Sequence, residues 1–246
     1  MISVCIATHN GEKYIKEQLD SILCQLSPED EVVISDDGST DATLEIIEGY
    51  KDTRIKIFHF KQPSKTSLTH IYTSRNFENA LKQAKGDYIF LSDQDDIWYS
   101  NKVESCLVYL SKYDLVVHNM ELINENGKSL GRNLYIKEFK HQNIWMKGHT
   151  YYGCAIAFKA KYLKAILPFP QKMMVHDFWI TYIIEKLGKT YYEMNPMMFY
   201  RYREDSVSHD VNNSLFFKIQ YRFKTTCQVV LRLVMCYIKI NYKNIS

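Results

Sequence analysis

The chain of 246 residues has little of the glycine, proline and cysteine patterning that marks several common protein classes. It contains nine glycines, and neither GxGxxG nor GxxxxGK[ST] occurs, so neither a dinucleotide-binding fingerprint nor a P-loop is supported. Its six cysteines show no CxxC spacing and lie mostly in apolar segments. That pattern favours reduced core residues of a cytosolic protein over a disulfide framework or a zinc site.

Long apolar runs are missing as well. No stretch of about 18 uncharged apolar residues exists, so no membrane-spanning helix is expected. No charged segment with an apolar core precedes the first strand, so no signal peptide is expected. The net charge of +3 is too small to indicate nucleic-acid binding by the chain as a whole. A hydrophobic content of 46% is ample for the core of one large domain, with or without an appendage.

Short apolar runs and segments of helical spacing alternate along the chain. This alternation predicts an α/β fold with a mostly parallel sheet and right-handed crossovers. In such sheets, ligands bind at the carboxyl ends of the strands. The predicted strands are 2–7, 31–35, 55–58, 87–91, 114–118, 153–158 and 198–202, and the predicted helices lie at 15–26, 44–47, 77–84, 101–110 and 180–187.

Two acidic loops each follow a predicted strand, at residues 36–41 and 93–96. In a parallel sheet both loops lie on the same edge, together with residues 8–10. Crowded carboxylates repel one another unless a cation lies between them, and oxygen ligands favour Mg²⁺ or Mn²⁺. By itself the 93–96 cluster also fits a polar turn that opens a helix, with Asp96 or Ser100 as its cap.

In combination and order, these motifs resemble the family 2 glycosyltransferases of the GT-A fold. The resemblance is closest to the bacterial polysaccharide-assembly branch, which includes rhamnosyl- and galactosyltransferase-like members. It implies a Rossmann-like mixed sheet flanked by helices, and inverting transfer of a sugar from a UDP-hexose or dTDP-rhamnose to a growing, lipid-linked surface polysaccharide. It covers about residues 1–205 and is carried by residues 4–10, 36–39, 76–77, 86–88 and 92–98.

The resemblance also assigns roles on the donor side. Thr8 and Asp37 border the nucleobase, and Asn10 and Asn76 belong to the same nucleotide-sugar site. The alternative for Asp37 is a loop residue that bonds its own backbone, as Asp does in turns. Because a second acidic loop is predicted on the same edge, we favour the binding role.

The DxD element is Asp93-Gln94-Asp95 by the same resemblance, with Asp93 facing the ribose and Asp95 holding Mn²⁺ or Mg²⁺. Negative charge grows on the diphosphate as the sugar leaves, and a divalent cation stabilises that charge. Asp36 and Asp96 are expected to be structural, as turn or cap residues.

The second half of the chain is expected to form the part of the active site that binds the acceptor. An inverting transfer needs a carboxylate opposite the leaving group, and by resemblance Asp177 is that base. Its position also suits a helix N-cap, where the helix dipole would lower its pKa. By resemblance, Gly153 and Cys154 line the acceptor or donor-sugar pocket, although a plain buried strand is an equal alternative. Trp179 is placed at the acceptor sugar, with core burial equally favoured.

A basic residue near the diphosphate would complete the site, and Arg203 is the candidate. Relatives of this branch often carry Tyr-Arg-x-His at this place, whereas here Asp205 stands where the histidine would be. The resemblance leaves the roles of Asp205 and His209 open.

Residues 213–246 differ from the rest of the chain. They contain six lysines and arginines, interleaved with aromatic and aliphatic residues, and no acidic residue. Such an amphipathic helical tail is typical of a segment that lies on an anionic membrane surface. Packing on the domain or in a homodimer is the alternative. We therefore divide the chain into a donor half (1–98), an acceptor half (99–212) and a tail, and expect a cytoplasmic enzyme peripheral to the inner membrane face, without nucleic-acid binding.

Two other functions fit part of this pattern. A sugar nucleotidyltransferase shares a sheet edge with acidic metal ligands, but it would need a phosphate loop rich in Gly, Lys and Arg after the first strand, where residues 9–12 supply none. A catalytically inactive module that binds a nucleotide-sugar or a lipid would keep the fold without turnover.

Overall fold

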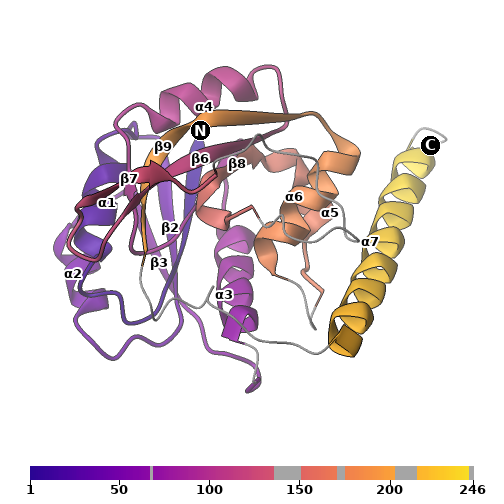
Figure 1. The fold of residues 1–246 in the computed structure, drawn as a ribbon, viewed down its shortest axis with the longest axis horizontal. Coiled ribbons are helices and arrows are strands. Elements are labelled where there is room, and N and C mark those ends of the chain that lie inside the picture. The colour runs from indigo at the N-terminus through magenta and orange to yellow at the C-terminus, as the bar shows by residue number, and fades with distance from the viewer. Residues whose placement is uncertain (67–68, 136–150, 171–174, 203–214, 244–246) are drawn as a thin grey trace.

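The computed structural model describes residues 1–66, 69–135, 151–170, 175–202 and 215–243. Within these residues the strands form one nine-stranded mixed sheet with helices on both faces (Figure 1). The strand order is β3-β2-β1-β4-β8-β6-β9-β5, and β7 pairs with β6 outside this path. The strands are β1 (Ile2–Thr8), β2 (Glu31–Asp36), β3 (Ile55–His59), β4 (Tyr88–Ser92), β5 (Ile97–Trp98), β6 (Leu115–Ile123), β7 (Ser129–Asn133), β8 (Ile156–Lys159) and β9 (Thr190–Arg201).

The amino-terminal half of the sheet is parallel, as predicted. Strand β1 pairs with β2 on one side and β4 on the other, and β2 pairs with β3. Both β1 and β2 are buried along nearly their whole length, because apolar residues occupy both faces of each strand. The register places Thr8 beside Asp36 and Ile6 beside Ser92, so the loops after β1, β2 and β4 leave from one edge.

The carboxyl-terminal half differs from the prediction in several elements: β5 and β7 were not predicted, and β6 extends to Ile123, beyond the predicted 114–118. The predicted strand at 153–158 is a 3₁₀ turn, η1 (Gly153–Ala155), followed by the shorter β8. Strand β9 begins at Thr190 and is therefore much longer than the predicted 198–202. Its Pro196 lies at a register shift between β6 and β9, where the ladder tolerates a residue that has no N–H.

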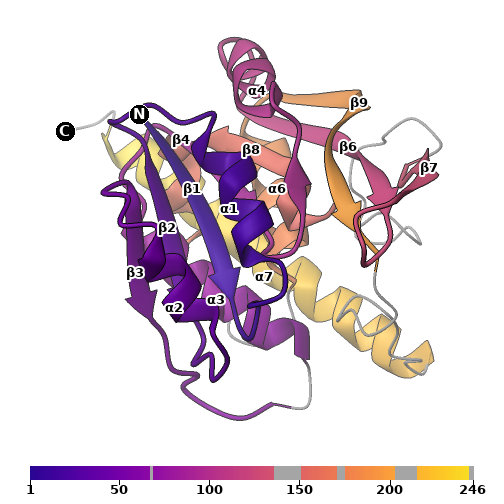
Figure 2. The same ribbon diagram turned by 90° about the vertical axis from the view of Figure 1, so that its left-hand side faces the viewer.

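Helices cover both faces of the sheet (Figure 2). On one face α1, α2 and α4 bury residues such as Leu19, Ile47 and Cys106. On the other face α3, α5 and α6 bury a second core that includes Phe77 and Ile183. The helices are α1 (Ile15–Leu23), α2 (Thr43–Gly49), α3 (Thr69–Gln83), α4 (Lys102–Leu110), α5 (Leu163–Ile166), α6 (His176–Leu187) and α7 (Leu215–Lys243), with a second 3₁₀ turn, η2 (Ala160–Tyr162).

Helix α7 lies outside α5 and α6 and carries the carboxyl terminus (Figure 1). Its Val229 is 2% exposed and joins the core of the α3, α5 and α6 face. In the part of the chain that the structure describes, no helix is long and apolar enough to cross a bilayer.

Candidate active site

The loops after β1 and β2 are hydrogen-bonded to each other at the carboxyl edge of the sheet. Asp36 accepts hydrogen bonds from the Thr8 hydroxyl at 3.0 Å and from the backbone N–H of Ser39 at 2.9 Å. Asn10, with φ 49°, accepts a bond from the Thr40 N–H at 2.8 Å. Asp36 is 1% exposed, so it closes this loop, in keeping with the structural role expected for it.

Asp37 lies at the rim of the same edge and is held by a residue that the sequence did not indicate. The amide of Gln62 donates a hydrogen bond of 2.5 Å to the Asp37 carboxylate and another of 3.2 Å to the carbonyl oxygen of Tyr72. Partial burial raises the pKa of Asp37, and the bond from Gln62 opposes that rise. Gln62 therefore fixes the direction of the carboxylate that we expect at the nucleobase.

Two other residues predicted for the donor site are buried behind this rim. The Thr8 side chain is 0% exposed and Asn76 is 3% exposed. Asn76 on α3 donates a 3.0 Å hydrogen bond to the Thr8 carbonyl oxygen, and its own Oδ1 has no hydrogen-bond partner among the described residues. In this structure both residues hold the end of β1 in place.

The acidic turn after β4 joins the loop after β1 through Gln94, and the loop after β1 is in turn bonded to the loop after β2. The Gln94 side chain accepts a 2.9 Å hydrogen bond from the His9 N–H and donates a 3.1 Å bond to the His9 carbonyl oxygen. Gly11 leaves the space for this side chain, since a Cβ there would lie 2.5 Å from Gln94 Oε1. The three loops predicted to meet on one edge are therefore in direct contact.

The acidic turn also contains the candidate metal ligands. Among the described residues, side-chain ligand atoms of Asp93, Asp96 and Cys154 lie within 4.8 Å of one another, and the partly exposed Asp95 belongs to the same turn. Asp96 is 1% exposed, and its pKa is raised well above its usual range by burial and by the charges of Asp95 and Asp93. Its Oδ2 has no hydrogen-bond partner within the described structure.

These donors fit a hard divalent cation. The carboxylates are ligands that Mg²⁺ and Mn²⁺ prefer, and the orphaned oxygen of Asp96 leaves one acceptor site open. Cys154 contributes little to such a site, because burial raises the pKa of its thiol and keeps it protonated. The sequence predicted Asp95 as the ligand, Asp93 at the ribose and Asp96 as structural, whereas the cluster contains Asp93 and Asp96 and does not include Asp95.

Two buried basic residues lie near the acidic turn, and one of them, Arg201, is hydrogen-bonded to it. Arg201, 3% exposed, donates from Nε to the Asp95 carbonyl oxygen at 2.8 Å and from its backbone N–H to Asp96 Oδ1 at 3.1 Å. Lys102, 0% exposed, donates to the Cys154 carbonyl oxygen at 2.9 Å. Burial lowers the pKa of Lys102 to about 8. Sequence reasoning assigned neither residue a role, because no local pattern links them to the turn.

Asp177 lies in the first turn of α6, with its side chain buried at 7% exposure. The helix begins at His176, so Asp177 stands inside the helix and Val175 occupies the cap position. Burial, with a smaller contribution from the charge of Asp93, raises the pKa of Asp177 to about 7 against the opposing effect of the 2.6 Å hydrogen bond from the Phe178 N–H. The expectation that the helix dipole would lower this pKa was wrong, because desolvation outweighs it.

The predicted acceptor-pocket residues lie close to α6 but are buried. Gly153 contacts His176, and Cys154 is 0% exposed in the η1 turn. Trp179 is 1% exposed, and its indole N–H donates a 2.8 Å hydrogen bond to the Ile166 carbonyl oxygen. Trp179 is thus a core residue here, which is the alternative that the sequence left open. Arg203, Asp205 and His209 lie outside the described residues.

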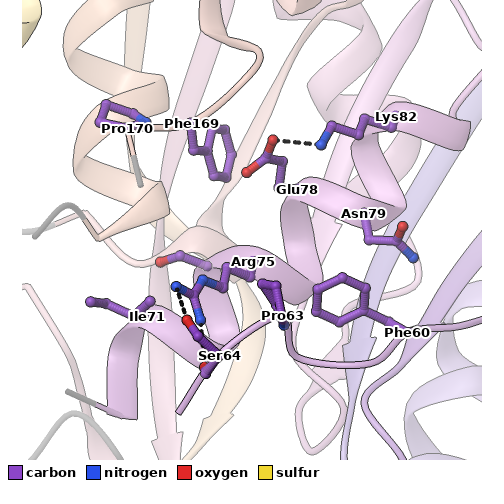
Figure 3. Close-up of a pocket in the computed structure, with 11 residues that line it drawn as sticks. Phe60, Pro63, Ser64, Ile71, Arg75, Glu78, Asn79, Lys82, Phe169 and Pro170 are labelled. Atoms are coloured by element: carbon purple, nitrogen blue, oxygen red, sulfur yellow. Dashed lines mark hydrogen bonds and ion pairs between the residues drawn. The ribbon is translucent and has the colours of Figure 1, made fainter. Parts of the chain in front are cut away.

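A cavity of about 230 Å³ lies between the segment that carries Phe60, Pro63 and Ser64 and helix α3 (Figure 3). Phe60 and Pro63 line it on one side, and α3 and Phe169 on the other. Arg75 on α3 crosses it to donate a 3.0 Å hydrogen bond to the Ser64 carbonyl oxygen. None of the predicted site residues lines this cavity, so we treat it as separate from the acidic edge.

The family of the chain is identified by a family model that matches most of the sequence. A family model described as "Glycosyl transferase family 2" matches residues 3–167, more than half of the sequence. The chain belongs to glycosyltransferase family 2. It is therefore a nucleotide-sugar-dependent glycosyltransferase, and the nucleotidyltransferase alternative does not apply.

Individual relatives of this family 2 glycosyltransferase agree with the assignment. The dTDP-rhamnosyl transferase RfbG of Shigella flexneri is 30% identical over 233 residues, which are 88% of this chain and 77% of that protein. The putative teichuronic acid biosynthesis glycosyltransferase TuaG of Bacillus subtilis is 27% identical over 213 residues, covering 85% and 81%. An uncharacterized glycosyltransferase of Rickettsia felis is 26% identical over 225 residues, but this chain spans only 36% of it.

Solved structures confirm the GT-A fold that the resemblance implied. TarS 1-349 of Staphylococcus aureus in complex with UDP-GlcNAc superposes with a TM-score of 0.63 at 22% identity, covering 85% of this chain and 61% of that one. The mannosyltransferase PcManGT of Pyrobaculum calidifontis, in complex with GDP-Man and Mn²⁺, gives a TM-score of 0.60 at 18% identity, covering 84% and 58%.

Proposed function

We propose that this glycosyltransferase transfers a hexose or deoxyhexose from a UDP- or dTDP-sugar, with inversion and with the help of Mn²⁺ or Mg²⁺, to a lipid-linked bacterial surface polysaccharide. The observation that carries the proposal is the position and protonation of Asp177. Its carboxyl group is buried, its pKa is about 7, and the charge of Asp93 in the acidic turn reaches it. A base in that range accepts a proton effectively near neutral pH.

Each residue of the acidic edge has one role in the proposed reaction. Asp37, oriented by Gln62, lies where the nucleobase would bind, and Asp93 faces the ribose. Asp95, with Asp96 beside it, would hold the divalent cation, which offsets the charge that develops on the diphosphate. Arg203, outside the described residues, stays a proposal as an auxiliary cation at the diphosphate.

In the proposed transfer one bond forms, one bond breaks, and the released proton goes to Asp177. The acceptor hydroxyl oxygen forms a bond to the anomeric carbon while the bond from that carbon to the diphosphate oxygen breaks. The hydroxyl proton passes to the Asp177 carboxylate, and the nucleoside diphosphate leaves with the bonding electrons. Gly153, Cys154 and Trp179 would then shape the acceptor side from behind, as buried supports.

The names of the relatives support the donor class. One relative is named a dTDP-rhamnosyl transferase, and TarS was crystallised with UDP-GlcNAc. We propose residues 1–98 as the donor half and residues 99–212 as the acceptor half of the domain. The test is a thermal-shift screen of UDP-, dTDP- and GDP-sugars with Mn²⁺, followed by donor hydrolysis. Turnover that Asp95→Ala abolishes supports a metal-dependent transferase, whereas binding without turnover supports an inactive module.

We also propose that α7 holds the enzyme on the cytoplasmic face of an anionic membrane. One side of α7 packs on the domain, where Arg232 donates hydrogen bonds of 2.8 and 2.7 Å to the carbonyl oxygens of Ala165 and Pro168. The other side exposes apolar side chains at 46 to 68%. Helix α7 contains basic residues and no acidic residue, so its net charge is positive, which favours an anionic lipid surface. The exposed apolar residues are Ile219, Phe223, Val230, Leu231, Val234, Met235, Tyr237 and Ile238.

Vesicle sedimentation tests this proposal. The wild-type chain should bind vesicles that contain phosphatidylglycerol, bind less at high salt, and lose binding in Leu231→Glu/Val234→Glu. Val108→Glu on α4 is the matched control, since Val108 is an exposed apolar residue at 61% that lies outside α7. Equal binding by all three proteins, or a dimer that only the α7 double variant disrupts, would overturn the membrane assignment in favour of another surface or a second copy.

A further inference from the structure

The first turn of α6, which carries Asp177, is held by the residue that precedes Asp177. His176 is 6% exposed, and its ring stacks on Phe77 of α3 with the centroids 4.3 Å apart. Its backbone N–H donates a 3.1 Å hydrogen bond to the hydroxyl of Ser74, and its Nδ1 lies 3.4 Å from the same oxygen. The Ser74 hydroxyl thus satisfies a backbone N–H at the start of α6 that the helix itself leaves unpaired.

The opposite edge of the His176 ring touches Gly153. A Cβ at position 153 would lie 2.5 Å from His176 Nε2 and 3.2 Å from Cδ2. The φ angle of Gly153 is outside the left-handed region, so the backbone conformation does not require glycine. Glycine is required because His176 leaves no space for a side chain. A larger residue would displace the imidazole, and with it the turn that presents Asp177.

The imidazole is neutral in this environment. Burial lowers the pKa of His176 to about 3. A ring that stays uncharged across the working pH range is unsuited to act as a proton donor or to bind the diphosphate. Its contacts with Phe77, Gly153 and Ser74 instead give it a mechanical role between α3, η1 and α6.

The same turn of α3 also reaches the donor side. Asn76 lies between Ser74 and Phe77 in the sequence, and its amide donates the 3.0 Å hydrogen bond to the Thr8 carbonyl oxygen at the end of β1. One turn of helix therefore contacts the strand that ends in the donor loops and the residue adjacent to the base. This arrangement ties the position of Asp177 to that of the nucleotide-sugar site.

We propose that His176, clamped between Phe77 and Gly153 and hydrogen-bonded to Ser74, is the positioning residue that sets Asp177 relative to the donor edge. The proposal rests on the proposed role of Asp177 as the base. It also gives Gly153 a purpose other than contact with a sugar, namely room for the imidazole.

Gly153→Ala tests the clamp with the smallest possible change. Gly49→Ala is the matched control, because nothing lies within 4 Å of a Cβ at Gly49 and its backbone is unstrained. With the donor that turns over in the screen, Gly153→Ala should lower kcat about tenfold or more and leave the donor KM within about twofold, since small displacements of a catalytic group cost up to ~100-fold. Gly49→Ala should match the wild type.

A double-mutant cycle separates positioning from general damage. In a His176→Ala background the space beside position 153 is vacant, so adding Gly153→Ala should change kcat by less than about twofold. Thermal melting of each variant confirms that it is folded. An unchanged kcat in Gly153→Ala, or an equal further loss in both backgrounds, would overturn the proposal.

A measurement that needs no turnover separates a failure of the His176 proposal from a failure of the proposed function. Carboxyl ¹³C NMR, assigned with Asp177→Asn, follows the titration of Asp177 in the wild type, Gly153→Ala and Gly49→Ala. If His176 positions Asp177, the pKa of Asp177 falls towards the ordinary value in Gly153→Ala alone, because a displaced turn exposes the carboxyl group. An unaltered titration contradicts the clamp, whereas turnover retained by Asp177→Asn contradicts the assignment of the base.

Discussion

Gln94 and His9 form a two-way hydrogen-bonded pair that joins the acidic turn after β4 to the loop after β1. The Gln94 amide oxygen accepts from the His9 N–H at 2.9 Å, and its amide nitrogen donates to the His9 carbonyl oxygen at 3.1 Å. Gln94 lies between Asp93 and Asp95, the proposed DxD element, so this pair of bonds ties the turn that carries both acidic residues to the loop after β1.

We expect Gln94→Ala to raise the donor KM severalfold and to lower the free energy of unfolding by about 1–2 kcal/mol, since two hydrogen bonds are lost. Gln25→Ala is the matched control. Gln25 also makes two bonds, to the Ser21 carbonyl oxygen at 2.7 Å and from the Val103 N–H at 3.1 Å, but away from the acidic edge. Urea unfolding should show similar losses in both variants, and kinetics should show a KM change only in Gln94→Ala. A KM change in both would point to stability alone.

Much of this arrangement was predictable from the sequence. The alternation of apolar runs with segments of helical spacing predicted the parallel strands, most directly β1, β2 and β4, because burial on both faces leaves continuous apolar runs. The carboxyl ends of neighbouring parallel strands share an edge, so the two acidic loops had to approach each other.

The supports of the site were not predictable, since they depend on contacts between distant segments. Arg201 meets Asp95 across 106 residues, and Gly153 meets His176 only after both segments have folded. The apolar run at 153–158 could not reveal that its first three residues form a 3₁₀ turn. The pKa of Asp177 was misjudged for the same reason, because burial is a tertiary property.

The rate should depend on pH through Asp177. Only the carboxylate accepts a proton, so kcat/KM for the wild type, which reports the pKa of the free enzyme, should rise as pH increases through about 7 and level off above it. Asp177→Asn should remove the turnover and leave nucleotide affinity nearly intact. A flat pH profile between 5 and 9 would contradict the assignment.

Stability supplies an independent check on the same residue. The folded-state pKa of Asp177 is raised from 3.8 to about 7, so ionisation in the folded state costs stability as pH rises from about 4 to about 7. Asp177→Asn, which carries no charge, should therefore gain stability relative to the wild type at pH 8, by at most ~4 kcal/mol, and lose that advantage below about pH 4. Unfolding curves at the two pH values measure the difference.

Asp96→Asn should weaken Mn²⁺ binding about tenfold or more, because it removes a charge from the acidic turn while keeping the side-chain shape. Mn²⁺ affinity of the wild type should rise with pH, since the raised pKa of Asp96 makes a proton compete with the metal. Asp87→Asn is the control, because that carboxylate lies at the opposite end of β4 and its side chain is 81% exposed. Isothermal titration with Mn²⁺ decides the question, and an unchanged affinity in Asp96→Asn would return Asp96 to a purely structural role.

Arg201→Met should be costly in both stability and function. Besides the Asp95 carbonyl oxygen, the guanidinium donates to the Glu125 carbonyl oxygen at 2.8 Å and to the Glu17 carboxylate at 2.5 Å. Removing it takes the donors away from the Asp95 and Glu125 carbonyl oxygens, while the Glu17 carboxylate, 54% exposed, is left to solvent, and we expect a loss of about 1–3 kcal/mol in the free energy of unfolding, together with a higher donor KM.

Arg54→Met is the control that separates the loss of function in Arg201→Met from its loss of stability. Arg54 likewise binds several groups, donating to the Leu23 and Leu26 carbonyl oxygens at 3.0 and 2.6 Å and to Asp52, but it contacts none of the three loops of the acidic edge. Both variants should unfold at lower urea concentrations, whereas only Arg201→Met should require more Mn²⁺ and more donor to reach half-maximal turnover. If the two variants keep the same Mn²⁺ and donor requirements, Arg201 stabilises the fold without positioning the acidic turn.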